Sequence, residues 1–464
     1  RLICESVYRI SGSTALSLTV IVLFIGASLG LAWTLLPKAE YLPSGNRNLV
    51  FGILLPPPGY NLDELIEVGQ KIEDVLRPRW EIRLDSPEAA AIDGPLVKNM
   101  FYVAFGGGAF MGVASQDPQR AGELVPLIQA PVFGTPGMIA IVRQASLFQG
   151  GGGRAIDIEI TGPDLHRLIG LGGQIFGQVM QTLPGAQARP IPSLDLGNPE
   201  VRITPDRIRA SDLGLSTRDI GVAVNALMDG ARIDGYQYQG EEIDLVLQGA
   251  DEWFRTQDIG ELLIYTPGGQ LVPLSSVADV ELTTGPAQIN HSERSRTITI
   301  QVYPPATLPL ETAMEQIQTE IVGPLLDGGQ VMPPYGIRLS GSADDLKRTR
   351  QSLQWGFLLA LIITYLLMAS LFESFLYPLV IMLSVPPALA GGILGLEAVN
   401  LLLTYQPLDI LTMLGFVILV GVVVNNAILI VHQSLNILRN DPEIEAKEAI
   451  RDAVASRVRP IFMS

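Results

Sequence analysis

A stretch of 22 residues without a charged side chain, from Ile410 to Val431, most constrains how this chain folds. A helix needs about 20 residues to cross the roughly 30 Å hydrocarbon core of a bilayer, so this stretch is long enough to span one. Asn425 and Asn426 interrupt it, and lipid offers no hydrogen-bond partners for their amides. The residues alone leave two interpretations open: hydrogen bonds to a neighbouring span, or a site that handles ions or protons.

Three further apolar segments could cross a membrane. The chain is 48% hydrophobic with a mean hydropathy of +0.32, which is high for a soluble enzyme. Four such segments in one chain favour insertion in a bilayer over a buried helical hairpin. The three additional predicted spans are Ala15–Leu36, Leu353–Leu371 and Leu379–Leu396.

The distribution of basic residues predicts how the spans are oriented. Arg1 and Arg9 precede the first span, and Arg439 and Lys447 follow the last, whereas the two short connections between the later spans carry no Lys or Arg. Positive charge near span ends favours the cytoplasmic side. We therefore expect both ends of the chain to lie in the cytoplasm and residues 37–352 to lie on the outer side of the membrane.

Charge and residue content exclude several classes of function. A net charge of −16 argues against nucleic-acid binding, which requires a basic surface. Cys4 is the single cysteine, so the external region cannot depend on disulfides. No nucleophile-elbow motif or metal-ligand spacing is present, and the three histidines are isolated from one another. We therefore predict neither an enzyme nor a cofactor, and no metal site. The histidines are His166, His291 and His432.

The predicted external region alternates strand and helix patterns. Asn48–Leu55 and Lys98–Phe105 have the composition of strands, and residues 155–160 alternate strictly between apolar and polar, as in a half-buried strand. Asn61 is a candidate N-cap for the helix that follows it. Such repeats predict an α+β architecture with helices packed on one face of a mixed sheet.

Two other segments have simple interpretations. Residues 233–247 predict a hairpin that exposes Tyr236 and Tyr238, although a solvent loop is an alternative. Gly150–Gly153 lacks the lysine and the following helix of a phosphate-binding loop, so we interpret it as a flexible hinge.

The chain resembles the C-terminal half of a resistance-nodulation-division (RND) efflux transporter of the hydrophobe/amphiphile, acriflavine-resistance-like branch. The segment around Asn425 and Asn426, from Gly421 to Val431, is similar to the tenth transmembrane helix of that family. Other similar segments follow in the family's order and spacing, and this order makes the resemblance specific. They are Leu36–Pro43, Leu55–Gly59, Arg143–Leu147, Ile158–Pro163, Asp212–Ser216, Val272–Val277 and Arg457–Met463.

The resemblance implies an α-helical transmembrane bundle with a large α+β periplasmic region. That region comprises ferredoxin-like βαβ porter subdomains and a docking subdomain. The implied divisions are a cytoplasmic start and first transmembrane helix at 1–36, a first porter subdomain at 37–154, and a second at 155–197 and 284–345. The docking subdomain spans 198–283, three transmembrane helices span 346–433, and a cytoplasmic segment spans 434–464. The chain stops before the last two helices of the family.

The resemblance also implies a function. Members of the family are secondary transporters, not enzymes. They use the proton motive force to export hydrophobic or amphiphilic compounds from the bacterial inner membrane. They work as homotrimers with a periplasmic adaptor protein and an outer-membrane channel. The predicted hairpin with Tyr236 and Tyr238 would reach the next protomer. Many relatives have a lysine where this chain has Asn425, and an amide can hydrogen-bond a carboxylate but cannot carry a proton.

The resemblance points to a substrate site in the first porter subdomain. Its expected residues surround a glycine run that is similar to a mobile loop between two pockets in the family. Their aromatic rings offer broad apolar contact with few directional demands. The residues predicted for this site are Tyr102, Phe105, Gly106, Gly107, Gly108 and Phe110, together with Ile156 and Ile158 of a later strand.

Two other functions remain open at this point. Met100, Met111 and Met138 could supply thioether ligands for export of Cu(I) or Ag(I), although scattered methionines more often fill a core. A transport-inactive membrane assembly protein is the second alternative, because Asn425 replaces an expected lysine.

Overall fold

The computed structural model describes residues 2–42, 46–146, 154–249, 256–305, 307–403, 405–441 and 443–463. The predicted hinge at Gly150–Gly153 lies outside these residues. The chain divides into two compact units. Unit 1 comprises Arg1–Leu55, Ile66–Ile191 and Asn290–Ser464, and unit 2 comprises Pro56–Leu65 and Pro192–Ile289.

Within the described residues, unit 1 contains four helical segments long and apolar enough to cross a bilayer. Each predicted span matches one of them. Helix α10 begins 11 residues before the predicted span, at 342 rather than 353, because Asp344 and Asp345 favour the positive end of the helix dipole. The four segments are α2 (Thr14–Leu35), α10 (Ser342–Phe372), α11 (Leu376–Met382) with α12 (Val385–Leu402), and α13 (Ile410–Asn440).

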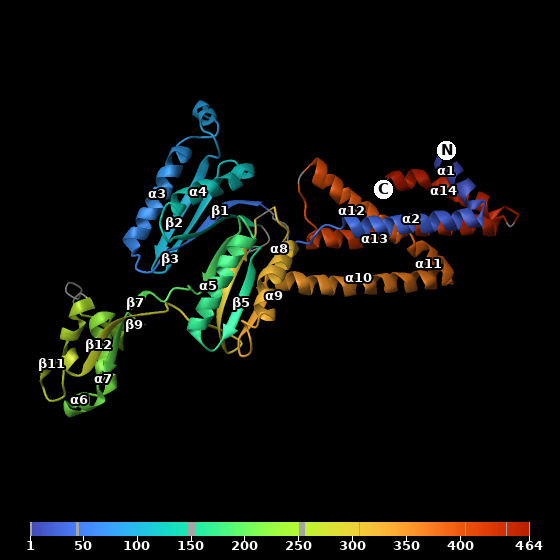
Figure 1. The fold of residues 1–464 in the computed structure, drawn as a ribbon. Helices are drawn as coiled ribbons and strands as arrows, with labels where there is room; N and C mark the ends of the chain where they lie inside the picture. The colour runs from blue at the N-terminus through green and yellow to red at the C-terminus, as the bar shows by residue number, and fades with distance from the viewer. Residues whose placement is uncertain are drawn as a thin grey trace. The chain divides into compact units, whose positions relative to one another are not determined.

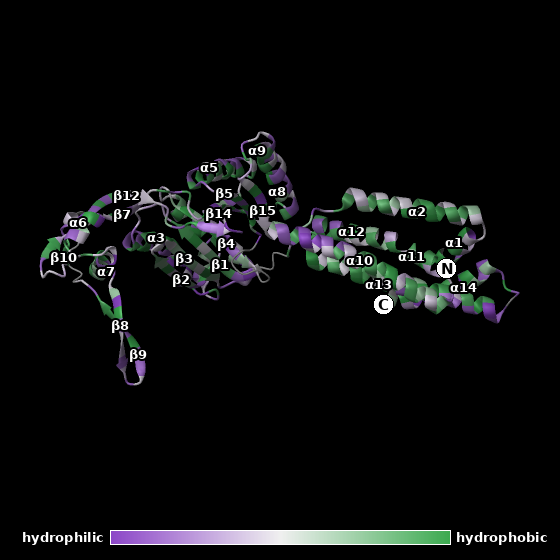
Figure 2. Ribbon diagram, turned by 90° about the horizontal axis from the view of Figure 1, so that it is seen from below, coloured by the Kyte–Doolittle hydropathy of each residue, from purple (hydrophilic) through white to green (hydrophobic). Residues whose placement is uncertain are grey.

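The break between α11 and α12 has a local cause. Helix α12 starts with proline in its first turn, where the missing N–H would have no intrahelical partner in any case. The spans pack on one another through a small apolar cluster. Figure 2 shows the bundle as mainly hydrophobic. The buried members of the cluster are Met368, Ile381, Val385, Val420 and Val424.

The ends of the chain lie together at one end of the bundle (Figure 1). Helix α1 (Leu2–Ser11) packs against α14 (Ala446–Met463). The Tyr8 ring centroid lies 5.5 Å from Lys447 Nζ and 5.6 Å from the Arg451 guanidinium carbon. An even number of spans returns the chain to the side of the bundle on which it started. The compartment in which both ends lie stays a prediction.

The first module of unit 1 is an antiparallel sheet with helices on one face. Its strand order is β2-β3-β1-β4, and α3 (Leu62–Trp80) and α4 (Leu124–Phe133) connect the strands in the βαββαβ order of a ferredoxin-like unit. The strands are β1 (Asn46–Leu55), β2 (Val97–Phe105), β3 (Gly108–Ser115) and β4 (Ile139–Ser146), and short helices η1 (Pro87–Ala91) and η2 (Pro118–Glu123) lie between elements. Apolar residues of the helices close the core beneath the sheet, namely Val68, Ile72, Leu76, Leu124, Ile128 and Val132.

The second module repeats this plan. Strand β14 pairs with β6 and β5, and β5 pairs with β15, which again places the first and third strands at the centre. Both sheets therefore confirm the predicted ferredoxin-like fold. The elements are β5 (Ile156–Gly162), α5 (Leu165–Thr182), β6 (Gln187–Ile191), β13 (Asn290–Ser292), β14 (Ser295–Tyr303), α8 (Leu310–Gln316), the π-helix η5 (Ile317–Val322), α9 (Gly323–Asp327) and β15 (Gly336–Gly341).

Unit 2 includes Pro192–Ile289, the chain between β6 and β13 of the second module, and the range predicted for docking, 198–283, falls inside it. Its longest ladder pairs β7 with β12 in antiparallel register. Ser216 caps α7 through a capping box with Asp219. The elements are β7 (Asn198–Pro205), α6 (Arg207–Asp212), α7 (Thr217–Met228), β8 (Ala231–Tyr238), β9 (Glu241–Leu247), η3 (Thr256–Glu261), β10 (Leu263–Tyr265), β11 (Leu271–Pro273), η4 (Leu274–Ser276) and β12 (Ala278–Gly285).

Backbone hydrogen bonds join the segment after α2 to the segment before α13. The Glu40 N–H donates to Leu408 O (2.9 Å), and the Ile410 N–H donates to Tyr41 O (3.3 Å). The same segment reaches helix α8 of the second module, where the Ala39 N–H donates to Glu311 Oε2 (2.7 Å). We call this meeting point the junction, defined by residues 38–41, 154, 305, 307–311 and 408–410.

Candidate substrate site and coupling residues

The face of the first sheet opposite its helices carries a set of apolar side chains that remain open. Side chains alternate across a strand, so Phe101, Val103 and Phe105 of β2 all point to this face. Their exposed fractions are 44%, 53% and 48%, and that of Phe110 on β3 is 40%. Together with Phe51 of β1, which is 8% exposed, these four residues form what we call the aromatic face.

Ring packing and glycine shape the aromatic face. The Phe110 ring centroid lies 5.6 Å from that of Phe101 and 6.3 Å from that of Phe51. Gly112 lies opposite Phe101, and a Cβ there would come within 2.3 Å of the Phe101 ring, so only glycine lets the ring lie over the strand. Phe105 and Phe110, both predicted for the substrate site, therefore lie on one face. Phe51, Phe101 and Val103 are additional members that the sequence analysis did not name.

The glycine run between these strands forms a tight hairpin turn. Gly106 and Gly107 are its two turn residues, and Gly108 begins β3 with a φ of 152°. A positive φ of this kind favours glycine. The predicted loop thus lies at the end of the aromatic face, and its mobility stays a prediction.

Tyr102 corrects the predicted site. It lies on the opposite face of β2, where its ring packs against α3, and a Cβ at Gly69 would come within 2.8 Å of it. Burial raises the pKa of Tyr102 to about 12. Odd and even positions of one strand face opposite sides, so Tyr102 cannot line the same surface as Phe105.

Ile156 and Ile158 also differ from the prediction. Both side chains are 0% exposed and lie in the core of the second module, on the face of β5 that the helices cover. An accessible pocket cannot be lined by side chains that a closed core surrounds, so we remove both from the substrate site.

The transmembrane amides lie on α13 without partners in the described part of the chain. Val424 belongs to the buried cluster, whereas Asn425 is exposed and Asn426 is partly exposed. Among the described residues, neither side chain forms a hydrogen bond. The expectation that at least one amide faces the interior of a larger bundle therefore stays a prediction.

The predicted hairpin is confirmed in unit 2. Strands β8 and β9 pair in antiparallel register, and Tyr236 and Tyr238 are 60% and 53% exposed. Figure 2 shows the hairpin extending from the rest of unit 2. A two-stranded hairpin has little stability of its own, so its exposed apolar side chains favour a partner surface. Contact with another protomer stays a prediction.

A buried ion pair holds the junction together, and sequence reasoning missed it. Glu40 is 3% exposed and pairs with Arg154 at 2.8 Å. Arg154 also donates to the carbonyls of Pro305 and Leu308, and the Leu310 N–H donates to Glu40 Oε2 (3.1 Å). These bonds connect the exit of α2 with the start of the second module and with the segment that leads into α8.

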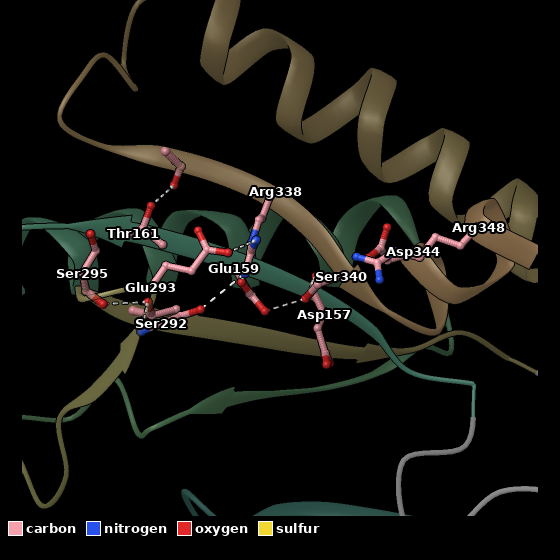
Figure 3. Close-up of polar contacts among 12 residues, drawn as sticks. Asp157, Glu159, Thr161, Ser292, Glu293, Ser295, Arg338, Ser340, Asp344 and Arg348 are labelled. Carbon is pink, nitrogen blue, oxygen red and sulfur yellow. Dashed lines mark hydrogen bonds and ion pairs between the residues drawn. The ribbon is translucent and has the colours of Figure 1, made fainter.

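The outer face of the second sheet is polar (Figure 3). Arg338 Nε donates to Glu159 Oε2 (2.6 Å), and Ser340 Oγ donates to Glu159 Oε1 (2.7 Å). On the same face Asp157 accepts a hydrogen bond from Gln301 Nε2 (2.9 Å), while burial raises the pKa of its carboxyl group. The two outer faces of the modules therefore differ: one is aromatic and the other carries paired charges.

The methionines considered for metal export are mostly core residues. Met111 is 0% exposed and Met138 is 7% exposed. Met111 packs so closely on β1 that a Cβ at Gly52 would come within 2.9 Å of it. No group of three or more His, Cys, Asp or Glu side chains suited to a metal ion occurs among the described residues.

Comparisons with known proteins agree with this architecture. The multidrug resistance protein MdtC of Erwinia amylovora is 29% identical over 270 residues, which are 57% of this chain and 25% of MdtC. MdtC of Yersinia pseudotuberculosis is 28% identical over 271 residues, with the same coverage. A solved heavy metal efflux pump matches 99% of this chain with a TM-score of 0.73 and 21% identity, which shows a shared fold.

The comparisons also show how much of a related protein this chain represents and to which family it belongs. This chain covers 46% of that pump, so it spans about half the length of the solved structure that it resembles. The profile of the AcrB/AcrD/AcrF family matches residues 4–464. The order of spans, modules and unit 2 is consistent with that match from end to end. The chain belongs to the AcrB/AcrD/AcrF family of RND efflux transporters.

Proposed function

We propose that this chain is part of an exporter that uses the proton motive force to remove hydrophobic or amphiphilic compounds. The aromatic face carries the proposal, because Phe101, Val103 and Phe105 stay about half exposed on a module whose opposite face is a closed core. A contiguous apolar patch that remains open usually binds something. The name of the MdtC proteins, multidrug resistance, supports varied compounds as substrates.

The surroundings of the exporter are part of the same proposal. Four helices long and apolar enough to cross a bilayer support a multi-pass protein of the bacterial inner membrane. We assign both modules and unit 2 to the periplasm from the distribution of Lys and Arg near the spans. We also propose a homotrimer that works with a periplasmic adaptor protein and an outer-membrane channel, and membership of the AcrB/AcrD/AcrF family supports this.

Heavy-metal export is the second candidate, favoured by the fold shared with the heavy metal efflux pump. Burial of Met111 and Met138 weighs against it, because thioether ligands must reach a passing ion. A transport-inactive assembly protein is the third. It predicts that no residue of the aromatic face affects resistance to any compound.

The substitution Phe110→Ala tests the proposed function in the complete transporter. Phe110 contacts Phe51 and Phe101 but is 40% exposed, so its truncation should cost on the order of 2 kcal/mol, less than for a buried phenylalanine. We expect normal abundance and a changed pattern of resistance across compounds. Phe133→Ala is the matched control, because Phe133 is 65% exposed at the end of α4, away from the aromatic face.

The measurements are minimum inhibitory concentrations for a panel of amphiphiles and immunoblots of membrane fractions. If Phe110→Ala lowers protein level and weakens export of every compound alike, Phe110 is a core residue and the site is wrongly assigned. If it behaves like Phe133→Ala for all compounds, the aromatic face takes no part in export.

A further inference from the structure

A groove opens between α2 and α10 at the end of the bundle that adjoins the junction. Both helices line it, together with residues of α8, α12 and α13. Helix α2 packs on α12, whereas α10 packs on α11 and α8, and the groove between α2 and α10 has a volume of about 470 Å³. This volume falls within the range of about 300–1,000 Å³ that is typical of sites for small molecules. The whole groove lies within unit 1.

The lining of the groove changes from polar to apolar with depth. Arg350, Gln354 and Phe357 line it at successive turns of α10, and Glu311 of α8 pairs with Arg350 (2.6 Å) at the polar end. Figure 2 shows the same change along α10, which is hydrophilic at its start and hydrophobic along the rest. The other spans contribute apolar residues to the deeper part, namely Leu29, Ala32, Leu389, Ile393, Phe416 and Val417. The groove therefore fits a molecule with a polar head and an apolar body.

The depth of the groove corresponds to one leaflet of a bilayer. Along α2 it extends from Leu36 to Leu29, and seven residues at a rise of 1.5 Å make about 10 Å. One leaflet contributes about 15 Å of hydrocarbon. Trp33 on α2 is 88% exposed and Trp355 on α10 is 67% exposed, both near the polar end. Tryptophan is enriched where a membrane meets water, so the polar end of the groove lies at that level.

The groove lies on the side of α13 that faces away from the transmembrane amides. Phe416 lines the groove, and Asn425 follows it by nine residues, which is two and a half turns of a helix. The two side chains therefore point to opposite faces of α13. Since we expect the amides to face the interior of a larger bundle, the groove is expected to face lipid.

Four charged groups surround the polar end of the groove. Lys38 pairs with Glu315 (2.9 Å), next to the pair of Arg350 with Glu311. The pKa of Lys38 is raised, first by its bond to Glu315 and to a smaller degree by Glu311, while Arg350 opposes the rise, so the four groups act on one another. Two positive and two negative charges give a cluster with no net charge. A head group of a single sign would meet repulsion from half of the cluster.

A phosphoethanolamine head group carries both signs and the matching donors and acceptors. Its phosphate oxygens suit the planar N–H fork of a guanidinium group. Its primary ammonium has three N–H donors for carboxylates, as a lysine side chain has. A choline head group lacks these N–H donors, and a glycerol head group lacks the positive charge. The cluster therefore discriminates among phospholipids by its pattern of charge.

We propose that the groove binds a phosphatidylethanolamine molecule from the leaflet nearest the modules. One acyl chain lies between α2 and α10, Arg350 binds the phosphate, and Glu311 and Glu315 accept hydrogen bonds from the ammonium group. Glu311 also accepts a bond from the Ala39 N–H, so the lipid head group adjoins the junction. The inference rests on the part of the proposed function that places the spans in a membrane, and it is independent of the exported compound.

The complete transporter in nanodiscs tests the proposal. The discs contain equal amounts of phosphatidylethanolamine, phosphatidylcholine and phosphatidylglycerol with the same acyl chains. Native mass spectrometry of the transporter released from the discs counts the lipids retained on each copy. Ala32→Phe blocks the apolar part of the groove. Ala27→Phe is the matched control, because Ala27 is exposed on a face of α2 that does not line the groove.

We expect the parent to retain phosphatidylethanolamine in preference to the other two lipids. Ala32→Phe should abolish this preference, and Ala27→Phe should keep it. Arg350→Gln should reduce retention about fivefold, the effect of one half-exposed charged contact. Glu315→Gln should reduce the preference over phosphatidylcholine and leave retention of phosphatidylcholine unchanged. Leu353→Phe blocks the same groove from α10 and replaces Ala32→Phe if that variant does not fold.

Equal retention of the three lipids overturns the proposal, and so does the same preference in Ala32→Phe and Ala27→Phe. Retention of no lipid also overturns it, because another part of the transporter then fills the groove. If an exported amphiphile displaces phosphatidylethanolamine from the parent, the groove is a substrate site and the proposal is wrong. A protein that is absent from the membrane fraction refutes the membrane location in the proposed function, which is a separate result from any lipid count.

Discussion

Replacing Glu40 with alanine would test how the membrane spans are joined to the modules. Glu40 lies four residues beyond Leu36, the last residue of the first predicted span, and its carboxylate accepts bonds from Arg154 and from the Leu310 N–H. The substitution removes these bonds and also the one that Glu40 Oε1 accepts from the Tyr41 N–H (3.2 Å). It leaves the backbone bonds from residue 40 to Leu408 and from Ile410 to Tyr41 chemically intact.

The size of the effect follows from burial. Removing one partner of a buried ion pair costs about 3–5 kcal/mol, because the other charge stays buried and unpaired. Arg154 keeps two carbonyl acceptors and its side chain is 18% exposed, so the lower end of this range, about 3 kcal/mol, applies. Since 1.4 kcal/mol corresponds to a factor of ten, the junction should open about 100-fold more often.

Hydrogen exchange measured by mass spectrometry on the complete transporter in nanodiscs reads out this opening. Peptides that contain residue 40 and Ile410 should exchange about 100-fold faster in Glu40→Ala. Glu315→Ala is the control, because Glu315 pairs with Lys38 on the exposed side of the same region. An exposed pair contributes about 0–1 kcal/mol, so exchange should rise less than about fivefold. If Glu40→Ala changes exchange no more than the control, the ion pair does not hold the junction.

Three further predictions concern the spans, the second module and unit 2. Asn425→Leu should reduce export in the assembled transporter at normal membrane abundance, and unchanged export would show that the amide is merely tolerated. Burial raises the pKa of Asp157, so its ionised form opposes folding: the cost is absent below the unfolded pKa, near 3.8, and complete above the folded pKa. Asp157→Asn should therefore raise the thermal midpoint at neutral pH but not below pH 3.8, and an equal gain at both pH values would contradict this sign. Cysteine at Gln270, exposed in the turn between β10 and β11, should react with an impermeant thiol reagent in cells with a permeabilised outer membrane when Cys4 is replaced by serine. If this cysteine does not react, the predicted orientation of the spans is wrong.

The sequence determined those features that depend on neighbouring residues. Length and lack of charge define the span at Ile410–Val431, because the hydrocarbon core acts on each residue according to its own polarity. Capping at Asn61, whose Oδ1 accepts a hydrogen bond from the Glu64 N–H, and the hairpin with Tyr236 are likewise local and were predicted correctly. The order of family segments along the chain gave the fold before any contact was known.

The candidate site was only partly accessible from the sequence. Alternation along β2 separates Tyr102 from Phe105, and attention to odd and even positions would have excluded Tyr102 and added Phe101. Alternation also predicted a half-buried strand at Ile156 and Ile158. It did not say which face the helices cover, because that depends on where α5 returns to the sheet.

Tertiary structure alone decided which distant groups meet. Glu40 and Arg154 are separated by 114 positions, and each has the appearance of an ordinary solvent-exposed charge in the sequence. Their burial arises because the exit of α2, the start of the second module and the segment before α8 converge. In the same way, Arg143 meets Tyr303 only because two separately formed sheets lie next to each other. Periodicity and polarity act over a few residues, whereas desolvation of a charge depends on everything that packs around it.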